Sequence, residues 1–555
     1  MKKILYSLLI VAASLTVSCD LDINKDPYDV TTLDFAQLLT ATEYEVAASF
    51  AEGNYLNANF SSYTHHTVSR EVNNYSLTAG YSTLGNTWQQ CYLSATKNAD
   101  ALISLGDAQG DNIYAAIGRI LKAYMFTNMV DLWGDIPYSE YNVNGNQAPH
   151  PDKGEDIYNA CFTLIDEALT ALAAPEGLEP AANDVIYNGD VDKWIKLANT
   201  LKLRMYVQTR KASDKITGWD AGLSALLTAN KFLADGEDFQ FPHTATTSPL
   251  DERKSGFYDE YYASQKSVWI SPWMHEIMTG AIYNFTENPL SGIVDPRCPY
   301  YWYNQISATK AAQNKTDYRD GAFVSILFAS NSGLDSGNQD ASMSVIGIYP
   351  VGGKFDDGSA AKVTSSSGTG IAPDKMIQAY SVPFMKAELA LAGKYAAGNA
   401  KTLLKEGIDA AIYHVNAVTK AANATAPKIS DTNRDAYSTA VLAKFDAGNA
   451  EKKMEIVMTE KWIANIYNSV EAYNDIRRTG FPKLFTGKNG KGYSPYANEE
   501  AATPTLTYPY TEINLKTIAA YPRVMWYPED ETKANPNIVN TDRVVSDRTV
   551  FWDVQ

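Results

Sequence analysis

The stretch EKKMEIVMTEKWIANIYNSVEAYNDI, residues 451–476, repeats apolar residues at helical spacing. Met454, Met458 and Trp462 recur at every fourth position and so share one face of a helix. The stretch contains neither glycine nor proline, the residues that most often interrupt a helix. It therefore predicts a helix with one apolar face.

The same periodicity returns along most of the chain. Residues 31–50 begin with Thr31 and Asp34 in an arrangement like a capping box. The helical segments come largely in pairs joined by short turns, as in tetratricopeptide-like hairpins, although the repeat of about 34 residues is degenerate. A mostly α-helical body is predicted. Its other helical segments are 87–105, 113–133, 156–174, 192–211, 380–395 and 400–420.

Two segments lack this periodicity. Residues 235–375 are crowded with Gly, Ser, Asn and aromatic residues, which predicts long loops on the helical scaffold and places much of the ligand-contacting surface there. The chain after about residue 481 is also irregular. Because it contains Trp526, Tyr527 and Trp552, it is too apolar for a disordered tail, and an ordered, extended wrap is expected.

The N-terminus predicts export and lipidation. Lys2 and Lys3 precede an apolar run, residues 4–17, that is shorter than the about 20 residues needed to span a bilayer. The following TVSC resembles a bacterial lipobox, with Thr16 where Leu is usual. Residues 1–18 are read as a signal peptide, Cys19 as the diacylated first residue, 19–30 as a tether and 31–555 as the folded body. The alternative is an ordinary cleaved signal with a stray cysteine.

Composition limits the ligand classes. The 555 residues carry a formal net charge of -17, which argues against nucleic acid and polyanionic ligands. Cys91, Cys161 and Cys298 are too sparse for a disulfide framework or a zinc site, and Cys161 lies on an apolar helical face. The 36 Tyr and 10 Trp suit either a surface for polar, ring-shaped ligands or a tyrosine-rich core.

No enzyme signature is present: the chain has no G-x-S-x-G elbow, no P-loop and no H-E-x-x-H motif. Three groups of residues could suggest a metal site or an acid/base pair, but each has a simpler reading: a polar loop, a turn without the alternating ligands of an EF-hand, and a chance pair among 64 carboxylates. No catalytic residue, metal or cofactor is expected. The three groups are His65, His66 and Glu71; Asp356 and Asp357; and Asp131 and Asp135.

Six short motifs, in order from the tether to the C-terminus, resemble the SusD/RagB family, in particular its SusD-like nutrient-binding outer-membrane lipoproteins. The resemblance implies a mostly α SusD-like fold of tetratricopeptide-like hairpins with long loop insertions. It also implies a lipid-anchored position on the outer leaflet of the outer membrane, and the acids after Cys19 resemble the family's surface-export signal. The motifs are DINKDP (22–27), LWGDIPYSEY (132–141), WIKLANTLKLRM (194–205), VDPRCPYY (294–301), EKWIANIYNSVEAYNDIRRTGFPKL (460–484) and VFWDV (550–554).

Most of these motifs have structural explanations. Arg477 and Arg478 are expected to pair with buried carboxylates or helix ends, and Gly480 and Pro482 to end a helix.

Aromatic residues in or beside irregular segments are the candidates for the ligand-binding face. Their flat rings can stack on the apolar face of a sugar while nearby amides bond its hydroxyls. The alternative for each ring is local packing, and Trp88, which opens a helix, is expected to face the core. The candidates are Tyr75, Tyr81, Trp269, Tyr301 and Trp302, with the amides of Asn73 and Asn74.

The expected function is that of a cell-surface binding protein that captures oligosaccharides without altering them. The resemblance implies delivery to a SusC-like TonB-dependent β-barrel, over which this protein would sit as a hinged lid. Oligopeptides are the first alternative cargo. A surface glycosidase and a helical-repeat adaptor without a small ligand are further alternatives.

Overall fold

A computed structural model gives the architecture of most of the chain. The predicted signal peptide, Cys19 and the tether lie outside the described residues, as do Thr31, Glu71, Asn73 and Asn74. The described residues are 34–51, 55–69, 75–245, 255–263, 266, 268–281, 288–312, 318–326, 328, 341–483 and 519–554.

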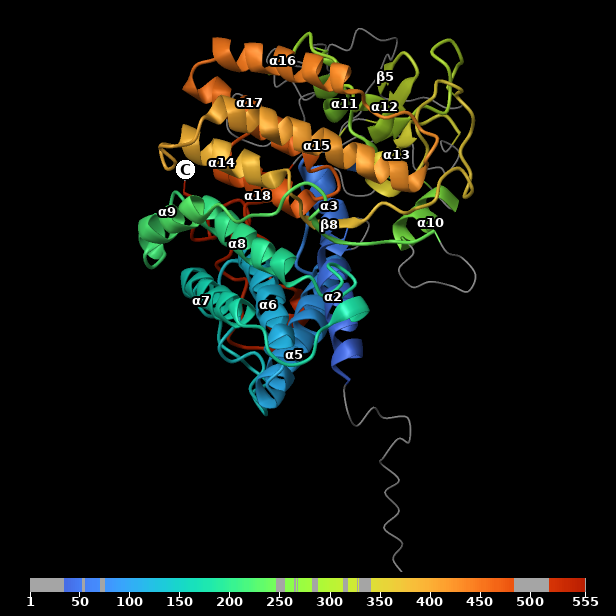
Figure 1. Cartoon of the computed structure of the whole chain (residues 1–555). Coiled ribbons are helices and arrows are strands. Elements are labelled where there is room, and N and C mark those ends of the chain that lie inside the picture. Colours follow the sequence, from blue (N-terminus) through green and yellow to red (C-terminus); the bar gives the residue numbers. More distant parts are fainter. Residues whose placement is uncertain are drawn as a thin grey trace, which may run out of the picture.

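Antiparallel helices build the N-terminal half (Figure 1). The first begins at Phe35, where the Asp34 side chain accepts a hydrogen bond from the Ala36 amide, and its predicted apolar face is buried. The predicted helix over 87–105 instead contains a π-helical segment, in which Thr96 Oγ1 donates to the Cys91 carbonyl. The elements are α2 (Phe35–Phe50), α3 (Tyr55–Tyr63), α4 (Ser82–Gln89), η1 (Gln90–Ala95), α5 (Thr96–Gln109), α6 (Asn112–Trp133), α7 (Gly154–Ala173), η2 (Ala181–Asn183), α8 (Val191–Gln208), η3 (Ser213–Lys215) and α9 (Trp219–Ala229).

A second group of helices lies above the first in Figure 1. The long helices α14 and α15 pack on each other and on α17, as expected for hairpin-based packing. They are α14 (Ser381–Leu391), α15 (Ala400–Ala422), α16 (Asp431–Ala447), α17 (Ala450–Ala464) and α18 (Ser469–Thr479). The short C-terminal α19 (Glu529–Ala534) instead contacts α4 of the first group.

The single helix predicted over 451–476 is two helices, α17 and α18. The chain leaves the helical conformation after Ala464, and Tyr467 adopts a left-handed φ of 61°. Tertiary contacts outweigh the local preference here: the Tyr380 hydroxyl donates to the Ala464 carbonyl at 2.9 Å and Lys375 Nζ to the Ile466 carbonyl at 2.8 Å. These donors satisfy carbonyls that a continuous helix would have bonded internally.

Apart from β1, the remaining short elements lie between residues 239 and 377, in and beside the predicted loop-rich segment. The strands pair antiparallel in two-stranded sheets: β1 with β3, β2 with β8, β4 with β7 and β5 with β6. The elements are β1 (Thr67–Ser69), β2 (Phe239–Phe241), α10 (Gly256–Ala263), β3 (Val268–Ile270), α11 (Pro272–Thr279), α12 (Cys298–Tyr301), β4 (Trp302–Tyr303), β5 (Tyr318–Asp320), β6 (Phe323–Ser325), β7 (Val345–Ile346), α13 (Ile348–Val351) and β8 (Asp374–Ile377).

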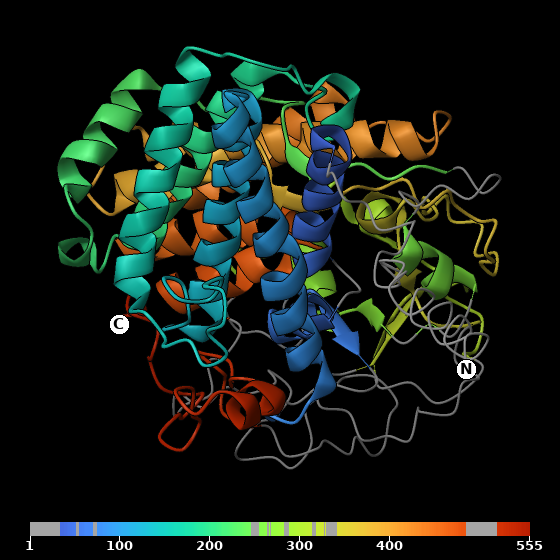
Figure 2. The same cartoon turned by 90° about the horizontal axis from the view of Figure 1, so that it is seen from below.

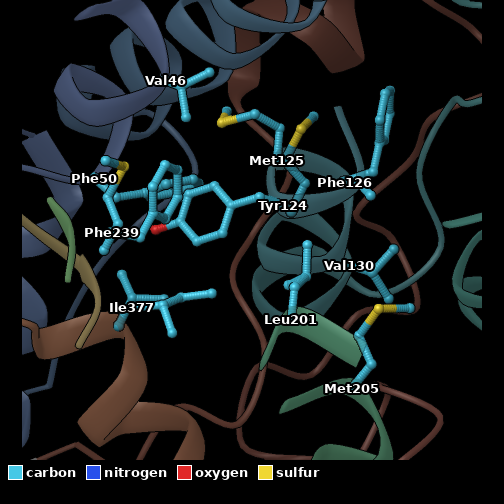
Figure 3. Close-up of a cluster of buried hydrophobic side chains, with 14 of the residues drawn as sticks. Val46, Phe50, Tyr124, Met125, Phe126, Val130, Leu201, Met205, Phe239 and Ile377 are labelled. Carbon is cyan, nitrogen blue, oxygen red and sulfur yellow. The ribbon is translucent and has the colours of Figure 1, made fainter. Parts of the chain in front are cut away.

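Two hydrophobic clusters form the core. The first joins the N-terminal helices to β2 and β8; Figure 3 shows Tyr124 of α6 beside Phe239 and Ile377, and the Tyr124 and Phe239 ring centroids are 5.3 Å apart. The second lies among α10–α17. Cys161 and Trp88 belong to the first cluster, as predicted. Within the described ranges, no helix combines the length and apolarity needed to cross a bilayer.

A buried ionic network joins α6, α8, α14, α17 and α18. We call it the junction network. Arg478, which is 1% exposed, donates to both carboxylate oxygens of Glu388 and to Asp475. Arg477 instead donates to the carbonyls of Asp131 and Arg523, so both arginines have the structural roles predicted for them. Gly480, with φ of 78°, ends α18 as predicted. The junction network comprises Asp131, Arg204, Arg210, Glu388, Lys461, Glu471, Asp475 and Arg478.

The described C-terminal segment, residues 519–554, is the predicted ordered wrap. Trp552 is fully buried and its indole N–H donates to Asp131 at 2.8 Å. Figure 2 shows the segment in red beside the loop that follows α6, where Asn535 and Asn537 donate to the carbonyls of Pro149 and Ala148.

Candidate functional site

The structure buries most of the aromatic side chains predicted to contact a ligand. Tyr75, Trp269, Tyr301 and Trp302 are at most 4% exposed, whereas Tyr81 is half-buried at the start of α4. Buried rings cannot stack on a sugar from solvent in this conformation, so the structure favours local packing for these four. A role in ligand binding stays a prediction for all five.

These side chains do not form one site. Trp269 pairs with Val68 between β3 and β1 and belongs to the first hydrophobic cluster. Tyr301 and Trp302 belong to the second cluster, where the Trp302 ring lies 5.3 Å from that of His275.

His65 and His66 do not lie in the polar loop that the sequence favours. Both are fully buried, and burial lowers the pKa of each ring to about 3. His66 Nε2 lies 2.8 Å from the Trp462 carbonyl and donates to it in the neutral ring. In the described part of the chain, no three His, Cys, Asp or Glu side chains are placed to hold a metal ion together.

Asp131 and Asp135 form hydrogen bonds and an ion pair within the fold. Asp131 is buried, and it accepts hydrogen bonds from Tyr158 and Trp552. Asp135 pairs with Lys153 at 2.6 Å and accepts the Gly154 amide at the start of α7. Each carboxylate therefore has a structural role.

An open hollow of about 760 Å³ lies in the loop-rich region and is lined by the loop after α13 and by the C-terminal end of α15. We call it the loop hollow. Its size is in the range of ligand sites, roughly 300–1,000 Å³. It is lined by Gly353, Lys354, Phe355, Asp357, Ser366, Ser367, Gly368, Thr369, Ala422, Asn423, Thr425, Ala426 and Pro427.

Phe355 supplies the aromatic surface of the loop hollow. Its half-buried ring packs edge-to-face against Tyr300, with centroids 4.9 Å apart. The Tyr300 hydroxyl donates to the Pro427 carbonyl at 2.7 Å, which ties this ring pair to the opposite wall. The pair therefore forms a supported apolar surface within a polar hollow.

Charged side chains at the rim are held in place. Lys354 Nζ lies 4.3 Å from the Tyr303 ring centroid and donates to the Tyr303 hydroxyl at 2.8 Å and to Ser359 at 3.2 Å. Hydrogen bonds from Ser359 lower the pKa of the exposed Asp357, so this side chain is an anion at neutral pH, as an ordinary aspartate is. The rim thus carries one ordered cation and one anion.

Hydroxyl and amide groups line the rest of the loop hollow. Ser367 Oγ accepts the Thr364 amide at 2.8 Å, and Asn423 Oδ1 accepts the Thr425 hydroxyl at 2.8 Å. These groups can bond a hydroxyl-rich ligand while its apolar face rests on Phe355.

The predicted loop-rich segment, residues 235–375, provides one wall of the loop hollow, but the aromatic residues predicted from sequence do not line it. In YYWY, residues 300–303, Tyr300 and Tyr303 support the loop hollow, whereas the predicted Tyr301 and Trp302 face the core. The chain changes here from α12 to β4, so neither helical nor strand periodicity could assign the faces. Phe355 could have been selected from the sequence, because it is an aromatic residue directly after GGK in the segment predicted to be loop-rich.

Comparison with solved structures identifies the fold. A chitin-binding protein superimposes with a TM-score of 0.65 at 21% identity, covering 94% of this chain and 100% of its own. A SusD/RagB family protein from Bacteroides thetaiotaomicron gives 0.64 at 20% identity, covering 94% and 99%. A chitin-binding SusD homologue from Flavobacterium johnsoniae gives 0.62 at 20% identity, covering 94% and 96%. No curated protein matches the chain.

A family comparison extends the assignment from fold to family. The model of the SusD-like family, described as "Starch-binding associating with outer membrane", matches residues 27–509. The chain therefore belongs to the SusD-like family of non-catalytic, glycan-binding proteins of the outer membrane.

Proposed function

We propose that this protein captures oligosaccharides at the cell surface and passes them to a SusC-like, TonB-dependent β-barrel. The observation that carries the proposal is the loop hollow, which combines the Phe355 ring with hydroxyl and amide groups in a SusD-like protein. Such a combination matches a sugar, whose ring has apolar C–H faces and a polar rim.

Chitin oligosaccharides are the first ligand to test. Two structural relatives are described as chitin-binding, and both cover 94% of this chain. The neutral sugars of chitin also fit a rim with one cation and one anion, Lys354 and Asp357, and a protein of net charge -17. Among the aromatic residues predicted from sequence, the half-buried Tyr81 is a second candidate contact.

Replacing Phe355 by Ala is expected to weaken retention of a neutral oligosaccharide about 5- to 30-fold, because loss of ring stacking costs about 1–2 kcal/mol. Isothermal titration with chito- and malto-oligosaccharides measures the change, and Phe355→Tyr, which keeps the ring, is the matched control. Wild-type affinity in Phe355→Ala would place the site elsewhere. Binding of oligopeptides in place of glycans would support the alternative cargo.

The N-terminal sequence provides the attachment in this proposal. Diacylated Cys19 would hold the protein on the outer leaflet, and the tether would let the body swing as a lid while it stays at high effective concentration beside its barrel. The sequence contains no P-loop, the motif with which many transport proteins bind ATP. In this proposal, the partner therefore moves the ligand across the membrane.

Mild-detergent extraction and pull-down of the wild-type protein are expected to recover a much larger outer-membrane barrel in comparable amount. The Cys19→Ser variant, which cannot be diacylated, is the control and should lose both palmitate labelling and the membrane fraction. Recovery of the wild-type protein alone, under conditions that preserve other outer-membrane complexes, would contradict the lid arrangement. Palmitate labelling of the variant would contradict the lipid anchor.

A further inference from the structure

A second hollow, of about 410 Å³, opens among α5, α6, α7 and the loop after α6. We call it the helical hollow. Its walls belong to the N-terminal helical group, whereas those of the loop hollow come from the loop after α13 and the end of α15. The family motif LWGDIPYSEY provides part of its wall through Tyr138, Ser139 and Tyr141.

Lys122 lies between the two tyrosine rings of this wall. Its ammonium nitrogen is 5.4 Å from the ring centroid of Tyr138 and 5.4 Å from that of Tyr141, and it pairs with Asp100 at 2.7 Å. Both rings are half-buried and pack against Phe126. The aromatic wall is therefore held in place and partly exposed.

The backbone of the wall is fixed from behind. Asp152 accepts the amides of Tyr138 and Ser139, each at 2.8 Å, and the Ser139 hydroxyl at 2.7 Å. These two amides are therefore not available to an extended peptide, which is recognised largely through main-chain hydrogen bonds. Side chains provide the recognition groups.

The charges of the helical hollow compensate one another. Arg119 pairs with Asp107 and Glu167, and Lys122 pairs with Asp100, so the cations already have carboxylate partners. An anionic ligand would have to compete with these pairs, and a purely apolar ligand would leave them desolvated. Asn142, which donates to Asp100 at 2.9 Å, adds an amide at the edge.

We propose that the helical hollow is a second carbohydrate site, which takes one neutral, hydroxyl-rich sugar ring through Tyr138, Tyr141, Lys122 and Asp100. The choice of carbohydrate rests on the proposed function, whereas the position of the site rests on this geometry. Two sites on one tethered protein raise its avidity for a long glycan beyond that of the loop hollow alone.

The substitution Ser104→Trp tests the second site. Ser104 is an exposed residue of α5 that lines the helical hollow, so an indole there fills the hollow without removing a packed side chain. Ser224→Trp, at an exposed position of α9, is the matched control. The probe is a neutral chito- or malto-oligosaccharide, and hydrogen–deuterium exchange of residues 138–143 and 353–369 reports each hollow separately.

With wild type and Ser224→Trp, the probe is expected to slow exchange in both segments by about twofold or more. Ser104→Trp should lose the effect at 138–143 alone, and Phe355→Ala the effect at 353–369 alone. Absence of protection at 138–143 in wild type, or its persistence in Ser104→Trp, would overturn the second site. Protection at 138–143 without any at 353–369 would support the second site and contradict the loop hollow.

Discussion

Replacing Arg478 by Met is expected to lower the free energy of unfolding by about 3–5 kcal/mol, because it removes one of the two cations that pair with each of the buried carboxylates Glu388 and Asp475. Arg478 donates to Glu388 at 2.9 and 2.7 Å and to Asp475 at 2.6 Å. Glu388 is fully buried, and water cannot replace the lost guanidinium without opening the structure. Chemical denaturation followed by circular dichroism measures the loss.

Arg434→Met is the matched control. Arg434 lies on α16 with a partly exposed side chain and pairs with the surface residues Asp431 and Asp435. Such exposed pairs contribute about 0–1 kcal/mol, so this substitution should change stability little. Equal losses in the two variants would mean that the junction network does not stabilise the fold more than a surface pair does.

The junction network is also expected to make the free energy of unfolding depend on pH, and the Arg478→Met variant should show a weaker dependence. Burial alone would raise the pKa of Glu388, but Arg478 and Arg210 lower it from 4.5 to about 2. A lowered folded pKa contributes stability that is present above pH 4.5 and is lost as the pH falls toward 2. Arg478→Met should therefore lose less stability over this interval than the wild type does.

The helices could be predicted from sequence because their apolar faces follow a simple period. In α2, for example, the predicted apolar face is buried and Asp34 caps the N-terminus. The break between α17 and α18 could not be predicted, because the donors that stabilise it, Tyr380 and Lys375, lie 84 and 91 positions before the carbonyls that they bond. Local periodicity carries no information about such partners.

The charges of the junction network show a second limit. Glu471, Asp475 and Arg478 are almost fully buried on α18, although charged residues on a helix normally predict a solvent-facing side. Arg478 and Asp475 pair within α18, but the other counter-ions lie on other helices, so most of the pairing is visible only in three dimensions. The resemblance of residues 460–484 to a family motif was the one sequence signal that these residues had a structural task, and the structure confirms it.

The candidate site was predicted at the level of the segment. Residues 235–375 do contribute a hollow with sugar-compatible chemistry, as expected for loops on a helical scaffold. The second wall, from Ala422 to Pro427, was not foreseen, since it comes from a helix end distant in sequence. Aromatic composition alone could not separate exposed rings from the buried ones that make up much of both clusters.

Replacing Trp269 and Trp302 together by Ala is expected to cost about 6–10 kcal/mol, most of the stability of an ordinary domain. Each large-to-small change in a core costs about 3–5 kcal/mol, and the two residues lie in different hydrophobic clusters, so their effects should add. The helical circular dichroism should therefore melt at a much lower temperature, or the protein should fail to fold.

The matched control is the double variant Trp269→Phe and Trp302→Phe, which keeps an aromatic ring at both positions. The buried Trp269 indole N–H has no hydrogen-bond partner among the described residues, so a Phe there removes a ring but no polar contact. This variant should lose much less stability. If the Ala variant instead keeps its melting curve and loses glycan binding, the two rings face the ligand and the burial described above does not hold in solution. If it unfolds while the Phe variant binds glycan normally, the sugar is recognised by other side chains, and the ring of Phe355 becomes the first to examine.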